Sequence, residues 1–385
     1  MGEPLQRIMI FSGGLKRAGA EKVVCDLALG MQQRGLKVTV CSVIGGDLAD
    51  ELAKAGIDVH VWSSQGRKYQ ASLSQSVIAI LKTSILLRKE RIQAINIHGL
   101  GPERIALLAS RLAGTPVRTF VFHSNYPSLY PEHGNTRLVK RLKADFKHVQ
   151  HFIAISENVM RLAVNSGIVS SEKISVIING IDLERMRSSR SRPEVRTSLG
   201  LRDEDVILIQ VGRFQPLKNQ DISVRAVALL LKRIPRIHLL LVGNGPTMKK
   251  VKDLVSQLTI EEYVHFLGLR SDVRDILHAS DLFLLPSDWE GIPISLLEAF
   301  ANSKPAVVTR VPGIKDIIEL DLGCAKMVAP KDEGSLALAI ENALLDSEWM
   351  ERAGNAGLNL VKTNFDSTRM VDQYVSLHEA LFWSA

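Results

Sequence analysis

Short apolar runs alternate with amphipathic helical segments along the first half of the chain. Helical segments such as 21–34 and 103–113 lie between runs that have the length and composition of strands. These runs cover residues 7–11, 37–43, 58–62, 94–97, 119–122, 152–155 and 174–178. Buried parallel strands joined by helices have this pattern, so the first half predicts an α/β domain with a parallel sheet.

The pattern restarts after a polar stretch at 184–205 that is rich in Ser and Arg. A second series of apolar runs covers residues 206–211, 237–242, 264–267, 282–285, 306–309 and 326–328. Two successive βα arrays predict two Rossmann-like domains. We expect an N-terminal domain at 1–182, a linker at 183–204 that has room for a short helix, a C-terminal domain at 205–365, and a last helix at 366–385 that packs back on the N-terminal domain.

Composition narrows the class of protein. The chain has 385 residues, of which 46% are hydrophobic and 23% charged, which excludes a disordered, collagen-like or disulfide-stapled protein. The 3 cysteines include no C-x-x-C pair, so a disulfide framework or a structural zinc site is not expected. No apolar run reaches the length of a spanning helix, and no signal peptide is evident. These features predict a cytoplasmic protein.

The charge of the chain is unevenly distributed. Residues 1–180 contain 23 Lys and Arg against 13 Asp and Glu, a net of +10, whereas residues 181–385 contain 25 against 28, a net of −3; together they give the overall +7. A basic front half suits a nucleic acid, an anionic membrane surface or a phosphorylated substrate. The two halves are therefore expected to have different partners.

Ligands of such sheets bind at the carboxyl ends of the strands, so residues just after each strand are the first candidates. Gly14 follows the first strand and precedes a helix that begins near Gly19. Glycines at this place let backbone N–H groups approach a phosphate, although a tight turn without a ligand has the same pattern.

The loop after the first strand of the second array contains two cations. Arg213 and Lys218 stand five residues apart in the segment 211–219. Two converging cations suit a diphosphate, whose charge needs neutralising as it departs. The alternative is a pair of solvated loop cations.

Two acids follow in the segment 286–299. Glu290 is expected in a loop after a strand, and Glu298, eight residues later, on the next helix. Carboxylates accept hydrogen bonds from sugar or ribose hydroxyls. Glu290 has the alternative interpretation of an ordinary acid at a helix N-terminus.

Two histidines, His98 and His123, end predicted strands. A histidine at a strand end can polarise or hydrogen-bond a substrate hydroxyl, and a purely structural role is the alternative for each. The Asn-Gly pair at 179–180 signals a turn, and we expect the two domains to close over a ligand around residues 179–182 and the polar linker.

Taken together, these segments resemble the retaining glycosyltransferases of family GT4, also called group 1. The resemblance covers nearly the whole chain and is most specific in the Glu290-x7-Glu298 motif, supported by Arg213 and Lys218. It implies the GT-B fold, in which two Rossmann-like βαβ domains face each other across a central cleft.

The resemblance also implies roles for individual residues. Arg213 and Lys218 would bind the donor diphosphate and stabilise the leaving nucleotide. Glu298 would hold the ribose hydroxyls, and Glu290 would contact the donor sugar. His123 would touch the donor sugar and support the reaction, which completes a catalytic set of His123, Arg213, Lys218 and Glu290.

Further donor contacts follow from the same resemblance. The backbone at Gly14 would lie by the diphosphate, Leu267 and Gly268 would line the base pocket, and Gly291 and Ile292 would belong to the donor-binding loop. No metal and no cofactor are expected, with a nucleotide-diphosphate sugar, a UDP-sugar in the first instance, as substrate.

The implied activity is retaining, metal-independent transfer of a hexose to a glycan or lipid-linked acceptor in polysaccharide or glycoconjugate biosynthesis. A GT-B relative with other chemistry, such as an epimerase or a phosphorylase, is the alternative, and a non-catalytic scaffold with a degenerate site is another. A nucleic-acid partner is not expected, because aromatic residues make up 5% of the chain and several lie in predicted strands.

The acceptor site is expected in the basic N-terminal domain. Segments 75–91 and 137–147 mix apolar and basic residues at near-helical spacing, which suits an anionic membrane surface. A solvated helix face is the alternative for both. The corresponding location is cytoplasmic, with a peripheral position on the inner face of the membrane.

Overall fold

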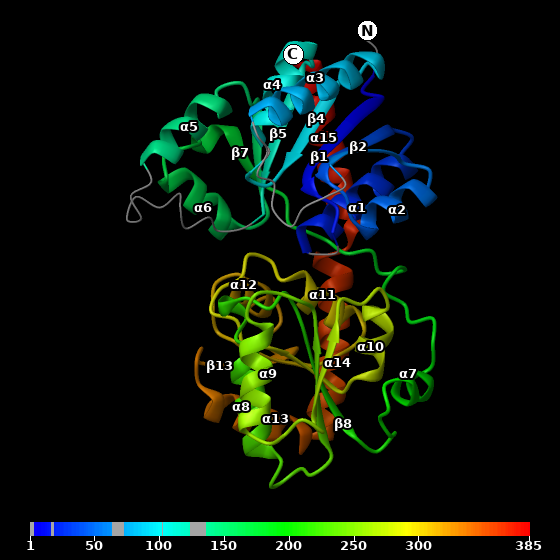
Figure 1. Ribbon diagram of the computed structural model, residues 1–385, viewed down its shortest axis with the longest axis vertical. Helices are drawn as coiled ribbons and strands as arrows, with labels where there is room; N and C mark the ends of the chain where they lie inside the picture. The colour runs from blue at the N-terminus through cyan, green and yellow to red at the C-terminus, as the bar shows by residue number, and fades with distance from the viewer. Residues whose placement is uncertain (1–3, 17–18, 64–72, 102, 124–135) are drawn as a thin grey trace. The chain divides into compact units, whose positions relative to one another are not determined.

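A computed structural model describes residues 4–16, 19–63, 73–101, 103–123 and 136–385. The chain forms two compact units (Figure 1). Unit 1 consists of Met1–Gly180 and Ser367–Ala385, and unit 2 of Ile181–Asp366.

Within the described residues, unit 1 is built on a seven-stranded parallel sheet with the order β3-β2-β1-β4-β5-β6-β7. Its strands are β1 Arg7–Gly14, β2 Lys37–Ile44, β3 Asp58–Ser63, β4 Ala94–His98, β5 Val117–Phe122, β6 His151–Ala154 and β7 Ile174–Val176. Its helices are α1 Gly19–Gln33, α2 Asp47–Lys54, α3 Leu73–Lys89, α4 Glu103–Ala113, α5 Thr136–Phe146, α6 Glu157–Asn165 and α15 Ser367–Trp383.

Successive residues of the central strands are buried, because helices cover both faces of a parallel sheet. Ile8 to Phe11 in β1 are all fully buried, and Ile8 pairs with Val38 on one side and Ala94 on the other. Strand β1 runs three residues further than the predicted 7–11, because Gly14 still pairs with Ile44 of β2.

The last helix of the chain, α15, belongs to unit 1 and packs on α1. Gly30 of α1 allows this close approach, since a Cβ there would lie 2.5 Å from Cγ2 of Val371. Arg34 binds the same helix through an ion pair with Asp372 at 2.5 Å. The end of the chain is thereby fixed to the sheet formed by its beginning.

In unit 2 the described residues form a six-stranded parallel sheet with the order β10-β9-β8-β11-β12-β13. Its strands are β8 Val206–Val211, β9 Ile237–Val242, β10 Val264–Gly268, β11 Leu282–Leu285, β12 Ala306–Thr309 and β13 Ala325–Val328. Its helices are α7 Arg192–Ser198, α8 Gln220–Leu230, α9 Met248–Gln257, α10 Val273–Ala279, α11 Ile294–Ala301, α12 Ile314–Ile318, α13 Glu333–Leu344 and α14 Ser347–Asn364.

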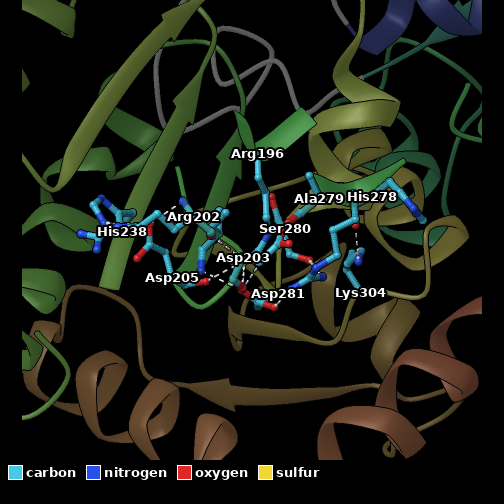
Figure 2. Close-up of polar contacts among 12 residues, drawn as sticks. Arg196, Arg202, Asp203, Asp205, His238, His278, Ala279, Ser280, Asp281 and Lys304 are labelled. Atoms are coloured by element: carbon cyan, nitrogen blue, oxygen red, sulfur yellow. Dashed lines mark hydrogen bonds and ion pairs between the residues drawn. The ribbon is translucent and has the colours of Figure 1, made fainter. Parts of the chain in front are cut away.

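A buried arginine fixes the polar segment before β8 to unit 2 (Figure 2). Arg196 of α7 is 1% exposed and donates to the carbonyl oxygens of residues 202, 203, 205 and 279. Its Nη2 also donates to Oδ2 of Asp281 at 2.9 Å, and that oxygen accepts from the backbone N–H of Ile207 at 2.8 Å. The stretch that was expected as a linker thus contributes a helix to unit 2.

All three cysteines are buried and none forms a disulfide. In the described part of the chain, no helix combines the length and the apolarity needed to cross a bilayer.

Candidate active site

The loops that follow β8, β9 and β10 are joined at the carboxyl edge of the unit 2 sheet. Gly212 donates its N–H to Val242, and Gly243 donates to Gly268 at 2.8 Å. Gly243 has a left-handed φ of 137°, and a Cβ there would lie 2.1 Å from the carbonyl oxygen of Gly212. Only glycine at position 243 permits this close approach of the two backbones. The close contact holds the three loops together at one edge of the sheet.

The backbone of Lys218 is held by a buried pair of polar side chains, Gln210 and Ser223. Lys218 ends the 3₁₀ turn η4 (Pro216–Lys218), and its carbonyl oxygen accepts from Nε2 of Gln210 at 2.7 Å. Gln210 lies in β8 and is itself bonded through Oε1 by the hydroxyl of Ser223 at 2.8 Å. The backbone of the cationic loop is therefore anchored to the strand and to α8.

The acidic loop at 286–293 is fastened to the same turn. Asn219, in the left-handed conformation with φ 48°, donates from Nδ2 to the Pro286 carbonyl at 2.9 Å and to Oδ1 of Asp288 at 2.7 Å. The N–H of Asp288 donates to the Leu217 carbonyl at 2.9 Å. These bonds bring the two loops predicted from the sequence into direct contact.

The centre of the contact is a charged pair. Nζ of Lys218 lies 2.5 Å from Oε1 of Glu290, and the side chains are 22% and 8% exposed. The hydroxyl of Ser287 donates to the same Oε1 at 2.6 Å. Among the described residues, no donor is bonded to the second oxygen of Glu290, Oε2.

The loop after β12 supports Glu290 from the other side. Gly313 has φ 82°, and a Cβ there would lie 2.1 Å from the Gly291 carbonyl oxygen and 2.4 Å from that of Glu290. The hydroxyl of Thr309 donates to the carbonyl oxygen of Ser287. The carboxylate is thus positioned by three post-strand loops.

Arg213 lies in the same loop as Lys218 but in a different environment. Its side chain is exposed, and within the described residues its guanidinium makes no hydrogen bond or ion pair. Its carbonyl oxygen accepts from Nε2 of Gln220 at 3.2 Å, so the backbone is fixed while the cation remains available.

The other unit 2 candidates lie around this edge. Glu298 is on α11, 3% exposed, and its carbonyl oxygen accepts from Nδ2 of Asn302 at 2.9 Å. Ile292 is buried just before α11. Leu267 and Gly268 end β10; Gly268 has φ 65°, and no heavy atom lies within 4 Å of the position of its missing Cβ.

His123 and Gly14 belong to unit 1. His123 follows β5, and its Nε2 lies 2.7 Å from Nδ1 of His98, which ends β4. Burial lowers the pKa of His123 to about 4 and lowers the pKa of His98 well below its usual range. Both imidazoles are therefore neutral near pH 7.

Three residues that support this site have no motif that predicts their role. Ser287 and Asn219 lie within the segments 286–299 and 211–219, and Gln210 lies in β8. Each is a polar residue whose side chain is buried. A buried polar group needs a partner, so the signal was a polar residue next to an apolar strand. Of the described residues, no three His, Cys, Asp or Glu side chains are arranged to hold a metal ion.

Comparison with known families identifies the class of protein. Residues 191–359 match the family model described as "Glycosyl transferases group 1", and residues 17–185 match "Glycosyltransferase Family 4". The chain belongs to this family of group 1 glycosyltransferases. Glycosyl transfer is thereby confirmed over the alternative chemistries of an epimerase or a phosphorylase.

Two curated relatives show how far the sequence likeness extends. The chain is 29% identical over 253 residues to the UDP-Gal:alpha-D-GlcNAc-diphosphoundecaprenol alpha-1,3-galactosyltransferase of Escherichia coli, a match that covers 63% of this chain and 64% of that enzyme. It is 26% identical over 366 residues to the N-acetyl-alpha-D-glucosaminyl L-malate synthase of Bacillus anthracis, covering 87% of this chain and 92% of the synthase. The first match spans just under two thirds of the relative.

Solved structures share the architecture. Anabaena HepE in complex with UDP and glucose superposes with a TM-score of 0.82 at 21% identity, covering 97% of this chain and 99% of that one. WaaG, a glycosyltransferase involved in lipopolysaccharide biosynthesis, gives a TM-score of 0.74 at 18% identity, covering 96% and 99%. The predicted GT-B fold with two Rossmann-like domains is confirmed.

Proposed function

We propose that the protein is a retaining, metal-independent glycosyltransferase that moves a hexose from a UDP-sugar to a glycan or lipid-linked acceptor. The observation that carries the proposal is the Lys218–Glu290 pair, with the exposed Arg213 in the same loop as Lys218. The relatives support the substrate classes: the Escherichia coli enzyme is named for a UDP-galactose donor and a lipid-diphosphate acceptor, and the HepE structure contains UDP and glucose.

In this proposal the two cations, Arg213 and Lys218, bind the departing diphosphate. Lys218 is oriented by its ion pair with Glu290, so its ammonium group is in place before negative charge develops on the leaving UDP. Arg213 is exposed and presents a guanidinium fork that fits two phosphate oxygens. Together the two side chains supply the positive charge that a bound metal ion supplies in other transferases.

The carboxylates recognise hydroxyl groups. Oε1 of Glu290 is bonded by Lys218 and Ser287, which leaves Oε2 to accept a hydrogen bond from the donor sugar. Glu298, on the helix that follows, is assigned to the ribose hydroxyls. Gly291 and Ile292 lie between the two acids and complete the donor-binding loop.

Glycines permit close backbone contacts with the nucleotide. Gly268 has open space where a Cβ would be, which supports its assignment, with Leu267, to the base pocket. Gly14 has no left-handed φ, and a Cβ there would meet only Ile44, at 3.9 Å. The fold therefore does not require glycine at position 14. We attribute the glycine to the diphosphate, which could approach the backbone closely only where no side chain is present.

In the proposed reaction the acceptor oxygen attacks the anomeric carbon from the face that the diphosphate leaves. The bond from the anomeric carbon to the phosphate oxygen breaks with its electron pair going to UDP, and a bond to the acceptor oxygen forms. The acceptor proton passes to the departing phosphate oxygen. Attack on the same face within the ion pair retains the anomeric configuration.

The configuration of the product tests this part of the proposal. A UDP-sugar panel is incubated with the protein and a lipid-diphosphate acceptor, and the anomeric proton coupling of the product is read by NMR. An α-linked donor should give an α-linked product. A β-linked product would overturn the retaining mechanism and leave the transferase assignment in place.

For the acceptor side, we propose peripheral contact of α3 with an anionic membrane on the cytoplasmic face. Four apolar side chains of this helix are exposed by 46–64%, namely Val77, Ile78, Leu81 and Ile85. They recur at helical spacing, and the cations Lys82, Arg88 and Lys89 are exposed among and after them. Exposed apolar residues flanked by cations suit a lipid surface.

Helix α5 supports the proposal less well. Its apolar residues Leu142 and Phe146 are buried, so the helix uses its apolar face for the core. The exposed side chains include Lys140, Arg141 and Lys143, and Arg141 is paired with Glu103 at 3.1 Å. This helix has the pattern of a solvated basic face.

Vesicle co-sedimentation tests the membrane contact. The double variant Ile78→Ser/Ile85→Ser should lose binding to anionic vesicles at low salt. The control Leu229→Ser/Leu338→Ser removes two leucines of similar exposure from α8 and α13 and should bind as the wild type does. Equal binding by both variants would overturn the assignment to α3.

A further inference from the structure

A chain of buried hydrogen bonds crosses unit 1 from the last helix to His123. Its first four members lie on α15, β5 and β4, which are labelled in Figure 1, and are no more than 4% exposed, and the fifth directly follows β5. In order they are His378, Thr119, Asn96, His98 and His123. Because all are neutral hydrogen-bonding groups, the direction of each bond is decided by its neighbours.

The direction of the hydrogen bonds is set at the α15 end of the chain, by a backbone carbonyl oxygen that can only accept a hydrogen bond. Nδ1 of His378 lies 2.7 Å from the backbone carbonyl oxygen of Tyr374, so Nδ1 carries a proton. Burial lowers the pKa of His378 to about 4, and the neutral ring has a single N–H. Nε2 of His378 must therefore accept, and it lies 2.9 Å from the hydroxyl of Thr119.

The middle of the chain is then determined. Thr119 has one proton. The carbonyl oxygen of Ile95 lies 3.4 Å from its hydroxyl, but the accepting nitrogen of His378 is nearer, at 2.9 Å, and would otherwise face a lone pair. Thr119 therefore donates to His378, and its oxygen accepts from the neighbour on the other side. That neighbour is the Asn96 side chain at 2.7 Å, which must present its Nδ2. The amide oxygen of Asn96 consequently faces Nε2 of His98, and Nε2 is protonated.

The last nitrogen of the chain is Nδ1 of His123, which carries a lone pair. Since Nε2 of His98 is protonated, Nδ1 of that neutral ring accepts from Nε2 of His123 at 2.7 Å. His123 is neutral as well, so its own Nδ1 carries a lone pair. Nδ1 of His123 is buried and has no hydrogen-bond partner among the described residues.

We infer that this chain fixes the tautomer of His123, so that its Nδ1 accepts a hydrogen bond from a substrate hydroxyl. His98, Asn96, Thr119 and His378 are positioning residues in this arrangement. The inference rests on the proposed function for the identity of the ligand, a sugar, but the tautomer itself follows from the protein alone.

The direction has a consequence for specificity. A group that can only accept, such as a phosphate oxygen or a carboxylate, meets a lone pair at Nδ1 and is repelled. A hydroxyl is bound because it donates. If every hydrogen bond of the chain ran the other way, a lone pair of His378 would face the Tyr374 carbonyl oxygen at 2.7 Å. The backbone of α15 therefore determines that His123 binds a hydrogen-bond donor.

The tautomers can be observed directly without any substrate. In the full-length protein with ¹⁵N-labelled histidine rings, long-range ¹H–¹⁵N spectra at pH 7.5 should show His98 and His123 protonated on Nε2 and His378 on Nδ1. Single histidine-to-glutamine variants assign the signals. A His123 ring protonated on Nδ1, or on both nitrogens, would overturn the inference whatever the activity.

Thr119 offers a sharp test of the positioning role. In Thr119→Val, Asn96 loses the acceptor that sets its orientation, so His123 should populate both tautomers. We expect kcat to fall about tenfold, the size of effect that outer hydrogen-bond partners of metal-ligating histidines have. Thr119→Ser should restore both readouts.

The matched control is Thr39→Val. Thr39 is also fully buried in the unit 1 sheet, but its hydroxyl has no hydrogen-bond partner among the described residues, so tautomer and kcat should stay unchanged. An unchanged His123 tautomer in Thr119→Val, or equal losses in both variants, would contradict the positioning role.

Substrate analogues test the ligand. Each hydroxyl of the donor sugar is replaced in turn by fluorine, which cannot donate a hydrogen bond. One position should lower kcat/KM in the wild type and lose its effect in His123→Phe. If no position shows this coupling, hydroxyl recognition by His123 is wrong; if the wild type transfers no sugar at all, the proposed function fails while the tautomer result stands.

Discussion

The ammonium group of Lys218 and the carboxylate of Glu290, 72 residues apart in the chain, are joined at 2.5 Å. The loops that carry them follow β8 and β11, adjacent strands of one parallel sheet. Removing one member of a largely buried pair leaves the other charge without compensation. In the proposed function, the pair links the recognition of the sugar to the stabilisation of the leaving nucleotide.

Glu290→Gln should lower kcat/KM about tenfold or more, as expected when a partly buried charge loses its partner. The amide keeps the volume of the side chain but removes the charge that orients Lys218. Initial rates of nucleotide release check this, with Glu90→Gln as the control, because Glu90 forms a similar pair with Lys37 at 2.7 Å in unit 1. Equal losses in the two variants would count against a specific role.

Gly313→Ala should displace the Glu290–Gly291 backbone, since the added Cβ would lie 2.1 Å from the Gly291 carbonyl oxygen. We expect a loss of activity and a lower melting temperature. Gly200→Ala is the control, because Gly200 has φ 73° but no heavy atom within 4 Å of the Cβ position, so only the backbone strain of about 1 kcal/mol applies. If both variants keep full activity, Gly313 does not support the site.

Arg196→Lys should lower the free energy of unfolding of unit 2 by about 3–5 kcal/mol, because an ammonium group cannot reach the carbonyl oxygens and the Asp281 carboxylate together. Urea unfolding measures this change. Arg202→Lys, at an exposed side chain, should change the same free energy by less than about 0.5 kcal/mol. A small effect of Arg196→Lys would show that the segment before β8 is held by other contacts.

Stability should fall as the pH is lowered from 6.5 towards 4. Burial lowers the pKa of His123 and of His378 to about 4, so between these pH values the unfolded chain binds more protons than the folded one. Each of the two histidines then contributes up to about 1.4 kcal/mol per pH unit. His98 is shifted in the same direction, and His151 lowers the pKa of His378 further.

His378→Gln isolates this contribution from that of the carboxylates, which also titrate in the window. The free energy of unfolding, measured by urea from pH 4.5 to 7.5, should depend less steeply on pH in the variant than in the wild type. Identical slopes would show that His378 is not held neutral in the folded protein.

The strands of unit 2 were predictable because their apolar runs are bounded by polar turns. β8, β9, β11 and β12 have the predicted bounds. The end of β1 was not predictable. The glycine pair at 13–14 has the pattern of a turn, whereas pairing of Gly14 with Ile44 continues the strand. Pairing with a neighbouring strand decides where such a strand ends, and the local sequence pattern carries no information about that pairing.

The candidate site was predictable to the level of the loops. Strand ends placed Lys218 and Glu290 at one edge, because the carboxyl ends of parallel strands share it. The supporting bonds were not predictable: Ser287 and Asn219 act through side-chain orientation, and His378 meets Thr119 from 259 residues away. Long-range polar contacts of this kind have no periodic signal in the sequence.

The most direct test of the central claim is UDP release from a panel of UDP-sugars with an acceptor, in the presence of a chelator. The wild type should turn over at least one donor with chelator present. Lys218→Ala should lose about 10²-fold or more in kcat, while Lys37→Ala, which breaks the comparable pair in unit 1, should keep wild-type turnover. Wild-type turnover in Lys218→Ala would contradict the assignment of this edge of the sheet as the donor site.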